Sequence, residues 1–294
     1  MRERAGLPGF ADLLAGDQIP GARRYQEDCF RLAGFPEPDP DGCDLLMVLA
    51  DGMGGHRGGA EASRLAVSSV VETFRQATGG VAARLRASLD AANAAVGRYA
   101  AEDARYAGMG CTLVACAVTD DETAHWISVG DSPLWRLHAD QEGAGRDDGA
   151  GGMVRLNADH SLRPVLQDLV RLGRMTAEEA GGAAHQLRSA VDGDELTLVD
   201  EGTAGRLGTG DRIVLASDGL ETLPDGEIQR LCGGHRTAAA VVADLLQAVE
   251  AAGRPSQDNA TVLVYQHAGA TGVRRRFERL TAPTHPVGRR RSGS

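Results

Sequence analysis

The sequence predicts an α+β fold in which antiparallel sheet layers are covered by helices. Six short aliphatic runs have the length of buried strands, and three longer stretches repeat apolar residues with helical spacing. Their order is a strand, two helices, a cluster of strands, a helical excursion, more strands, a helix and a last strand. A doubly wound parallel sheet needs regular alternation of strand and helix, so this order favours antiparallel sheets.

The individual elements follow from these patterns. The expected strands cover residues 45–50, 111–119, 125–129, 134–138, 212–217 and 261–267. The expected helices carry the apolar stripes Val67, Val70, Val71 and Phe74; Leu85, Leu89, Ala92, Val96 and Tyr99; and Val242, Leu245, Leu246 and Val249. A further short helix is expected to begin at Thr176, because Thr is a good N-cap and Glu178 and Glu179 follow in the first turn.

Composition and charge narrow the class of protein. With 294 residues, 42% hydrophobic and 24% charged, the chain is typical of globular proteins. Its net charge of −10 argues against nucleic-acid binding by the chain as a whole. Its five cysteines form no Cys-x-x-Cys motif, which predicts free thiols in a reducing cytoplasm. The longest apolar run, residues 45–50, is too short to span a bilayer, so no membrane association is expected.

Two segments have little apolar content. Residues 140–152 are rich in Gly and acidic residues and predict a surface hairpin loop. Residues 269–294 predict a disordered basic tail after a folded domain of residues 1–268. The tail is interpreted either as a solvated end or as an electrostatic docking arm for an acidic partner.

Four acidic clusters lie beside predicted strands. They are Gln26-Glu27-Asp28, Asp51-Gly52-Met53-Gly54-Gly55-His56, Ser217-Asp218-Gly219 and Asp258-Asn259. A carboxylate at the end of a buried strand is desolvated, and a cation is one good compensator. Hard ions such as Mg²⁺ and Mn²⁺ prefer oxygen ligands. Any single Asp-Gly could instead be a turn, so spacing alone predicts a metal site without proving one.

The chain resembles the metal-dependent protein phosphatase family, protein phosphatase type 2C, in its compact bacterial form. The resemblance spans about residues 18–267 and rests on seven motifs in family order. These are Gly21-x-Arg23-x-x-Gln26-Glu27-Asp28, Asp51 to His56 followed by Gly59 to Ser63, Met109-Gly110-Cys111-Thr112, Val129-Gly130-Asp131-Ser132, Asp159-His160-Ser161, Ala216-Ser217-Asp218-Gly219-Leu220 and Gln257-Asp258-Asn259-Ala260-Thr261. One such motif is weak evidence, whereas seven in order are specific.

The resemblance implies a four-layer α-β-β-α sandwich, with two antiparallel sheets face to face and helices outside. It also implies two Mn²⁺ or Mg²⁺ ions, with Asp51 bridging both. Asp218 and Asp258 would hold the first ion. Glu27 and the Gly52 carbonyl would hold the second. Asp28 would act through bound water, and Asp131 with Asp218 would hold a weaker third ion.

The implied reaction is hydrolysis of phosphoserine or phosphothreonine in proteins. A water activated by the two ions would attack phosphorus in line. Arg23 would bind the phosphoryl oxygens, since a guanidinium matches phosphate, although Arg24 is a rival. The implied partners are substrates of a cognate serine/threonine kinase, and the chain is expected to be a monomer.

The sequence departs from the family pattern in three places. Met53 stands where some members have His, so the general acid is open between His56 and water. Thr222 stands where an acid is common, with Glu221 just before it, which puts the third ion in doubt. Pro133 stands where Arg often follows the Gly-Asp-Ser turn. Two other functions stay open: a pseudophosphatase that only binds, and a two-metal phosphoesterase that acts on small molecules.

Overall fold

A computed structural model describes residues 12–35, 42–54, 57–139, 152–234 and 236–269. The hairpin loop predicted at residues 140–152, apart from Gly152, the basic tail after Gly269, and His56 lie outside the described residues. None of the described helices combines the length and apolar composition that crossing a membrane requires.

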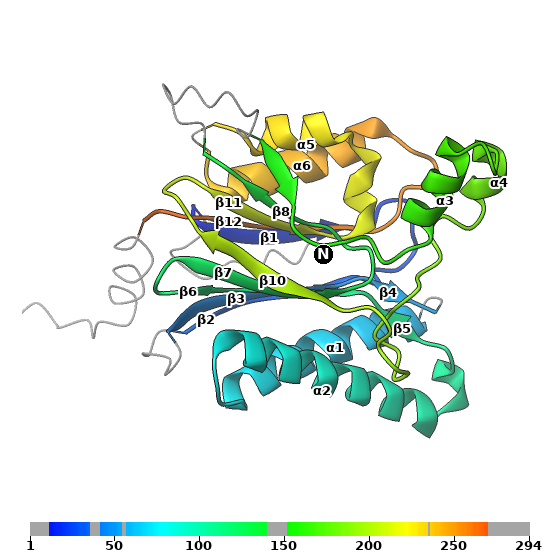
Figure 1. Ribbon diagram of the computed structural model, residues 1–294, viewed down its shortest axis with the longest axis horizontal. Coiled ribbons are helices and arrows are strands. Elements are labelled where there is room, and N and C mark those ends of the chain that lie inside the picture. Colours follow the sequence, from blue (N-terminus) through cyan, green and yellow to red (C-terminus); the bar gives the residue numbers. More distant parts are fainter. Residues whose placement is uncertain (1–11, 36–41, 55–56, 140–151, 235, 270–294) are drawn as a thin grey trace, which may run out of the picture.

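Two five-stranded sheets form the centre of the molecule (Figure 1). One sheet has the order β1-β12-β11-β8-β9, the other has the order β10-β7-β6-β3-β2, and all neighbours are antiparallel. The strands are β1 Leu14–Ile19, β2 Cys29–Gly34, β3 Cys43–Ala50, β6 Leu113–Thr119, β7 Thr123–Val129, β8 Leu134–Leu137, β9 Met153–Arg155, β10 Asp200–Arg206, β11 Arg212–Ala216 and β12 Ala260–Gln266. A separate short pair joins β4 Gly52–Met53 to β5 Gly110–Cys111.

Helices cover the outer face of each sheet (Figure 1). α1 Arg57–Gln76 and α2 Val81–Glu102 pack on the sheet that contains β3, and α5 Asp225–Cys232 and α6 Ala238–Ala252 cover the sheet that contains β11. α3 Arg163–Arg171 and α4 Ala177–Gly181 lie at one end of the sandwich. The short 3₁₀ helices are η1 Ala104–Tyr106 and η2 Asp218–Thr222. This arrangement confirms the α-β-β-α sandwich.

The continuous apolar runs follow from burial of both sheet faces. Along β3, Leu46 and Val48 pack beneath α1 and α2, whereas Leu45 and Met47 face the other sheet. Successive side chains of a strand point to opposite faces, so a strand with both faces buried is apolar at every position. All six predicted strands and the three helices with apolar stripes are present. The free thiols are also confirmed for all five cysteines.

Two features differ from the expected elements. The predicted strand 111–119 is divided at Thr112, because Cys111 pairs with β4 while Leu113 begins β6 in the main sheet. The sequence also missed β1, β2, β4, β9 and β10. The predicted cap of α4 is confirmed, since the Thr176 hydroxyl accepts from the Glu179 N–H and the Glu179 side chain accepts from the Thr176 N–H.

Candidate metal and phosphate site

One cavity gathers acidic residues from distant parts of the chain. Its volume is about 310 Å³. Predicted site residues lining it are Arg23, Glu27, Asp51, Gly52, Asp131, Asp218 and Asp258. Met53, Thr112, His185 and Asn259 also line it. His185 therefore lies at the same cavity as the acids.

Strand ends bring these residues together. Asp51 directly follows β3, Asp131 lies two residues after β7, and Asp218 lies two residues after β11. Asp258 lies two residues before β12, which runs antiparallel to β11, so it joins the other acids at the same end of the sandwich. Asp28 precedes β2 and is buried beside this group.

Burial and mutual repulsion make the charged forms of these carboxyls unfavourable. Burial raises the pKa of Asp51 well above its ordinary range, and the charges of Asp28 and Asp218 raise it further. Burial, followed by the charge of Asp131, raises the pKa of Asp218 to about 8. The Asp131 pKa is raised to about 6 by burial and by Asp159, although Arg163 opposes the rise.

Asp28 is held by two hydroxyl groups from the other sheet, one on β12 and one directly after β11. Its Oδ2 accepts hydrogen bonds from Ser217 Oγ at 2.8 Å and Thr261 Oγ1 at 2.6 Å. Burial raises its pKa to about 6, and these two hydrogen bonds limit the rise. Its second oxygen, Oδ1, is buried without a hydrogen-bond partner among the described residues. An acceptor in this state indicates an interaction still to be made.

The Asp51 backbone is fixed by Thr112, a residue to which the sequence assigned no role. The Asp51 N–H donates to Thr112 Oγ1 at 3.0 Å, and the Thr112 N–H donates to the Asp51 carbonyl at 2.8 Å. Thr112 Oγ1 also lies 2.7 Å from Ser132 Oγ. The hydroxyl thus joins the turn containing Asp51 to the turn containing Asp131. Its position in the Met-Gly-Cys-Thr motif was the only signal in the sequence.

Asn259 and Ser63 fix Glu27 in a similar way. Asn259 Oδ1 accepts from the Glu27 N–H at 2.8 Å, while its Nδ2 donates to the Pro20 and Tyr25 carbonyls at 2.9 and 3.0 Å. Ser63 Oγ donates to the Glu27 carbonyl at 2.6 Å. The acidic segment is therefore held by residues far away in the sequence.

Gly52 lies where no side chain fits. A Cβ built there would be 2.2 Å from the Gly59 carbonyl oxygen and 2.5 Å from the Glu27 carbonyl oxygen. Main chain from three segments therefore meets at this point, as expected where backbone carbonyls approach a ligand closely.

Arg23 pairs with a predicted metal ligand. Its Nη2 lies 2.6 Å from Asp258 Oδ2, and the two side chains are 53% and 41% exposed. The guanidinium therefore lies at the opening of the cavity.

The donor chemistry fits Mg²⁺ or Mn²⁺. Among the described residues, no three acidic, histidine or cysteine side chains are close enough together to form a complete cage. Such a cage is not required, because Mg²⁺ usually keeps several waters and uses one or two carboxylates. The carboxylates, the accessible carbonyl region at Gly52 and the buried Asp28 oxygen supply hard donors, and a cation would offset their repulsion.

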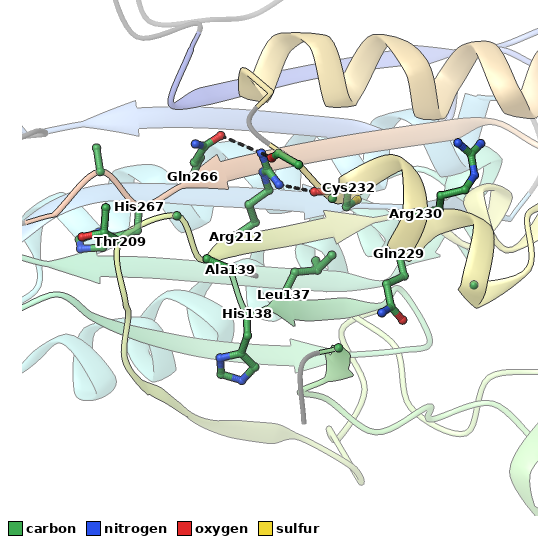
Figure 2. A pocket seen from close by; sticks show the side chains of 16 residues that line it. Leu137, His138, Ala139, Thr209, Arg212, Gln229, Arg230, Cys232, Gln266 and His267 are labelled. Atoms are coloured by element: carbon green, nitrogen blue, oxygen red, sulfur yellow. Dashed lines mark hydrogen bonds between the residues drawn. The ribbon is translucent and has the colours of Figure 1, made fainter. Parts of the chain in front are cut away.

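A larger cavity, of about 1180 Å³, lies near the opposite end of β11 (Figure 2). Arg212 lines it, but its guanidinium donates to the carbonyls of Cys232, Gly234 and Arg236 and to the Gln266 side chain. These bonds hold the guanidinium in a structural role, so the chemistry points to the smaller acidic cavity despite the difference in size.

The chain is similar to known phosphatases. The family model described as protein phosphatase 2C matches residues 37–144. "Serine/threonine phosphatase stp" of Listeria innocua is 28% identical over 229 residues, which cover 75% of this chain and 84% of the relative. "Protein phosphatase PhpP" of Streptococcus pneumoniae is 31% identical over 190 residues, which cover 62% and 69%.

Solved structures agree with this similarity. The serine/threonine phosphatase PstP of Mycobacterium tuberculosis superposes with a TM-score of 0.68 at 27% identity, covering 87% of this chain and 98% of PstP. A PstP catalytic domain in complex with two manganese ions gives 0.67 at 28% identity, with the same coverage. The fold, the order of motifs and the similarity to PhpP over more than two thirds of its length agree, and the chain belongs to the protein phosphatase 2C family.

Proposed function

We propose that this chain is a Mn²⁺- or Mg²⁺-dependent phosphatase that hydrolyses phosphoserine and phosphothreonine in proteins. The observation that carries the proposal is the single cavity to which Glu27, Asp51, Asp131, Asp218 and Asp258 all contribute. The enzyme class agrees with the names of the relatives, which are serine/threonine phosphatases. Mn²⁺ is the ion present in the PstP complex, and the oxygen donors here suit Mn²⁺ or Mg²⁺.

In this proposal Asp51, Asp218 and Asp258, with Glu27 and the Gly52 carbonyl, would hold two ions, and Asp28 would act through water. When bound, two divalent ions make water acidic enough to react near neutral pH and neutralise charge on phosphoryl oxygens. Thr112 and Asn259 keep the acidic segments in place through the hydrogen bonds described above.

Arg23 is proposed to bind the phosphoryl group and to hold it for in-line attack by water. Its side chain is 53% exposed at the cavity, and its present partner Asp258 occupies only part of the guanidinium fork. The general acid stays open, since the candidate His56 lies outside the described residues and Met53 has no titratable group.

The proposal extends to the organisation of the protein. We assign residues 1–268 to the catalytic domain and residues 269–294 to a basic tail. We propose phosphorylated proteins as substrates, a serine/threonine kinase as the enzyme that produces them, and a monomer as the active form. Light scattering on the purified full chain measures the last of these.

Turnover of a chromogenic aryl phosphate with Mn²⁺, and again in excess chelator, tests the enzymatic part. Metal-dependent turnover supports the proposal, and its absence favours a pseudophosphatase. Activity on a phosphoprotein is then compared with activity on free phosphoserine and nucleotides. A preference for free phosphoserine or nucleotides would show that the substrates are small molecules rather than proteins.

A further inference from the structure

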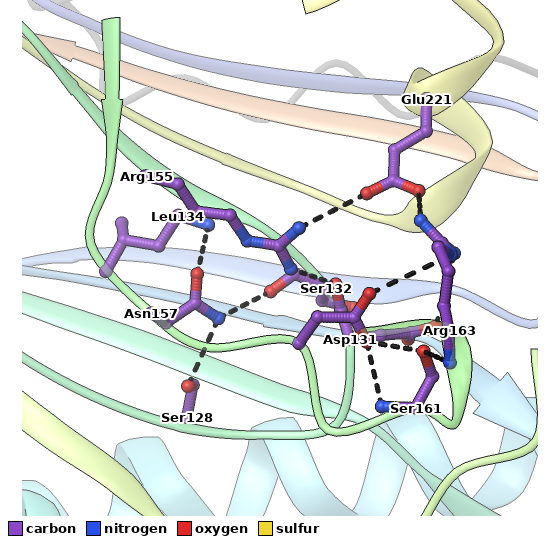
Figure 3. A network of polar contacts seen from close by, with 10 residues as sticks. Ser128, Asp131, Ser132, Leu134, Arg155, Asn157, Ser161, Arg163 and Glu221 are labelled. Carbon is purple, nitrogen blue, oxygen red and sulfur yellow. Dashed lines mark hydrogen bonds and ion pairs between the residues drawn. The ribbon is translucent and has the colours of Figure 1, made fainter. Parts of the chain in front are cut away.

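Arg163, the first residue of α3, lies among three carboxylates from three separate segments (Figure 3). Its Nη1 donates to Glu221 Oε2, its Nη2 lies 3.9 Å from Asp131 Oδ2, and its Nε lies 3.8 Å from Asp159 Oδ2. The side chains of Arg163 and Asp131 are only 21% and 7% exposed. Solvent therefore screens these charges less than it screens a surface pair.

A second guanidinium supports the same group from the other side of Glu221. Arg155 Nη1 lies 3.4 Å from Glu221 Oε1, and Arg155 Nη2 donates to the Asp131 backbone carbonyl at 2.7 Å. Arg155 thus contacts the Asp131 main chain, whereas the Arg163 guanidinium lies within 4 Å of the Asp131 carboxylate. Three acids and two arginines give the group a formal charge of −1.

Asp131 is the residue for which the sequence predicted a weak third ion, together with Asp218. The two acids do influence each other, since the charge of Asp131 is the largest charge effect on Asp218. Glu221, the acidic neighbour of the non-ligating Thr222, instead bonds to both arginines. The side chains that could complete a third site are therefore already engaged with guanidinium groups.

We propose that the fixed positive charge of Arg163 takes the place of a third divalent ion by compensating the charge of Asp131. The acidic cavity then holds two ions and no third. The inference rests on the proposed two-ion function and refines it. Arg163 is a positioning residue, which also fixes the start of α3 against the acidic group.

Charge arithmetic supports this replacement. The group of three acids and two arginines has a formal charge of −1, so binding a dication would bring its charge to +1. The ion would also lie a few ångströms from a guanidinium. Without the Arg163 charge the group is −2, which a dication neutralises. Unit charges at such distances interact strongly where solvent is limited. We therefore expect removal of Arg163 to strengthen a third site on the order of tenfold or more.

Mn²⁺ binding to the full-length protein, measured by titration calorimetry and by equilibrium dialysis with metal analysis, tests the inference. The variants are Arg163→Gln, Arg163→Lys and Arg171→Gln. Arg171 is the matched control, because it lies on the same helix and pairs with Asp168 at 3.0 Å on the exposed surface. We expect two bound ions in wild type, Arg163→Lys and Arg171→Gln, and three in Arg163→Gln. Adding Asp131→Asn to Arg163→Gln should remove the third ion.

The outcomes separate the inference from the function on which it rests. Three ions in wild type, with the third lost in Asp131→Asn, would overturn the inference even if Arg163→Gln failed to fold. Unchanged stoichiometry and affinity in a folded Arg163→Gln protein would overturn it too. If wild type bound no ions that depend on Asp51, the proposed function itself would be wrong, and the inference with it.

Discussion

Strand β11 has an aspartate near each end, and the two carboxyls have opposite surroundings. Asp211, just before the strand, accepts hydrogen bonds from Arg136 Nη2 at 2.6 Å and from the N–H groups of Ala139 and Gly208, both at 2.9 Å. Asp218, just after the strand, has other carboxyls as its main charged neighbours. Both residues stand next to Gly, with Asp211 before and Asp218 after the apolar run of residues 213–216.

The pKa values of the two carboxyls diverge for this reason. Burial raises the pKa of Asp211, but hydrogen bonds from Ala139, Arg136 and Gly208 together bring it below its ordinary value. For Asp218, burial and neighbouring acids act in the same direction and raise the pKa to about 8. One end of β11 thus has an internally compensated charge that stabilises the fold. Asp218, at the other end, has a raised pKa instead, and carboxyls perturbed in this way are typical of a functional site.

Asp51→Asn should produce the largest effect, because it removes the proposed bridging ligand. We expect turnover of an aryl phosphate at saturating Mn²⁺ to fall about 10³-fold, while circular dichroism shows a folded protein. Asp218→Asn should behave similarly. Chelator should abolish wild-type activity, and added Mn²⁺ should restore it. A near-wild-type rate in either variant would contradict the assignment of these ligands.

Asp211→Asn should instead act on stability. It leaves the partly buried Arg136 guanidinium without its carboxylate, and we expect the free energy of unfolding to fall by about 3 kcal/mol. Activity per folded molecule should be unchanged. Urea unfolding in chelator provides the contrast with Asp218→Asn, which removes a repelled carboxylate and should be at least as stable as wild type. Equal destabilisation by both variants would remove the distinction between the two ends.

The pH dependence of the Asp211 contribution has a defined sign. Its pKa in the folded state lies below the ordinary 3.8, so the folded protein binds this proton less tightly than the unfolded chain does. The contribution is complete well above pH 3.8 and is lost as pH falls through the lower folded pKa. The difference in unfolding free energy between wild type and Asp211→Asn should therefore shrink at acidic pH. A difference that grew below pH 3.8 would refute this sign.

Thr112→Val should produce a smaller effect at the acidic end. The variant keeps the shape of the side chain but loses the contacts with the Asp51 N–H and the Ser132 hydroxyl. We expect Mn²⁺ affinity or turnover to fall about 10- to 100-fold. Thr112→Ser, which keeps the hydroxyl, is the control and should recover most of the loss. If both variants were equally impaired, the methyl group rather than the hydroxyl would matter.

Arg230→Gln should produce the smallest effect. Arg230 lines the large cavity and pairs with Glu227 at 2.6 Å, but the side chains are 65% and 37% exposed. We expect no measurable change in unfolding free energy, because an exposed ion pair contributes little, and unchanged turnover of aryl phosphate. A large loss of turnover would show that the cavity near Arg212 contributes to the reaction.

Most of the sheet strands in the core could be predicted from the sequence. β3, β6, β11 and β12 are buried on both faces, so the apolar runs reveal them directly. β10 was missed because its seven residues are polar or small and none is buried. It forms a strand through pairing with β7, far away in the sequence, and at the edge of the sheet it needs little apolar content.

In the candidate site, too, some features could be predicted from the sequence and others depend on the tertiary structure. The sequence by itself determined which acids stand at strand ends, because Asp beside Gly after an apolar run is a local pattern. The tertiary structure decided which of them lack a compensating charge. Asp211 and Asp218 both stand beside Gly at an end of β11, yet Arg136 reaches only one, while Arg163 reaches Asp131 from the start of α3. Electrostatic compensation depends on distances between segments that only the packed chain brings together, and no local spacing encodes them.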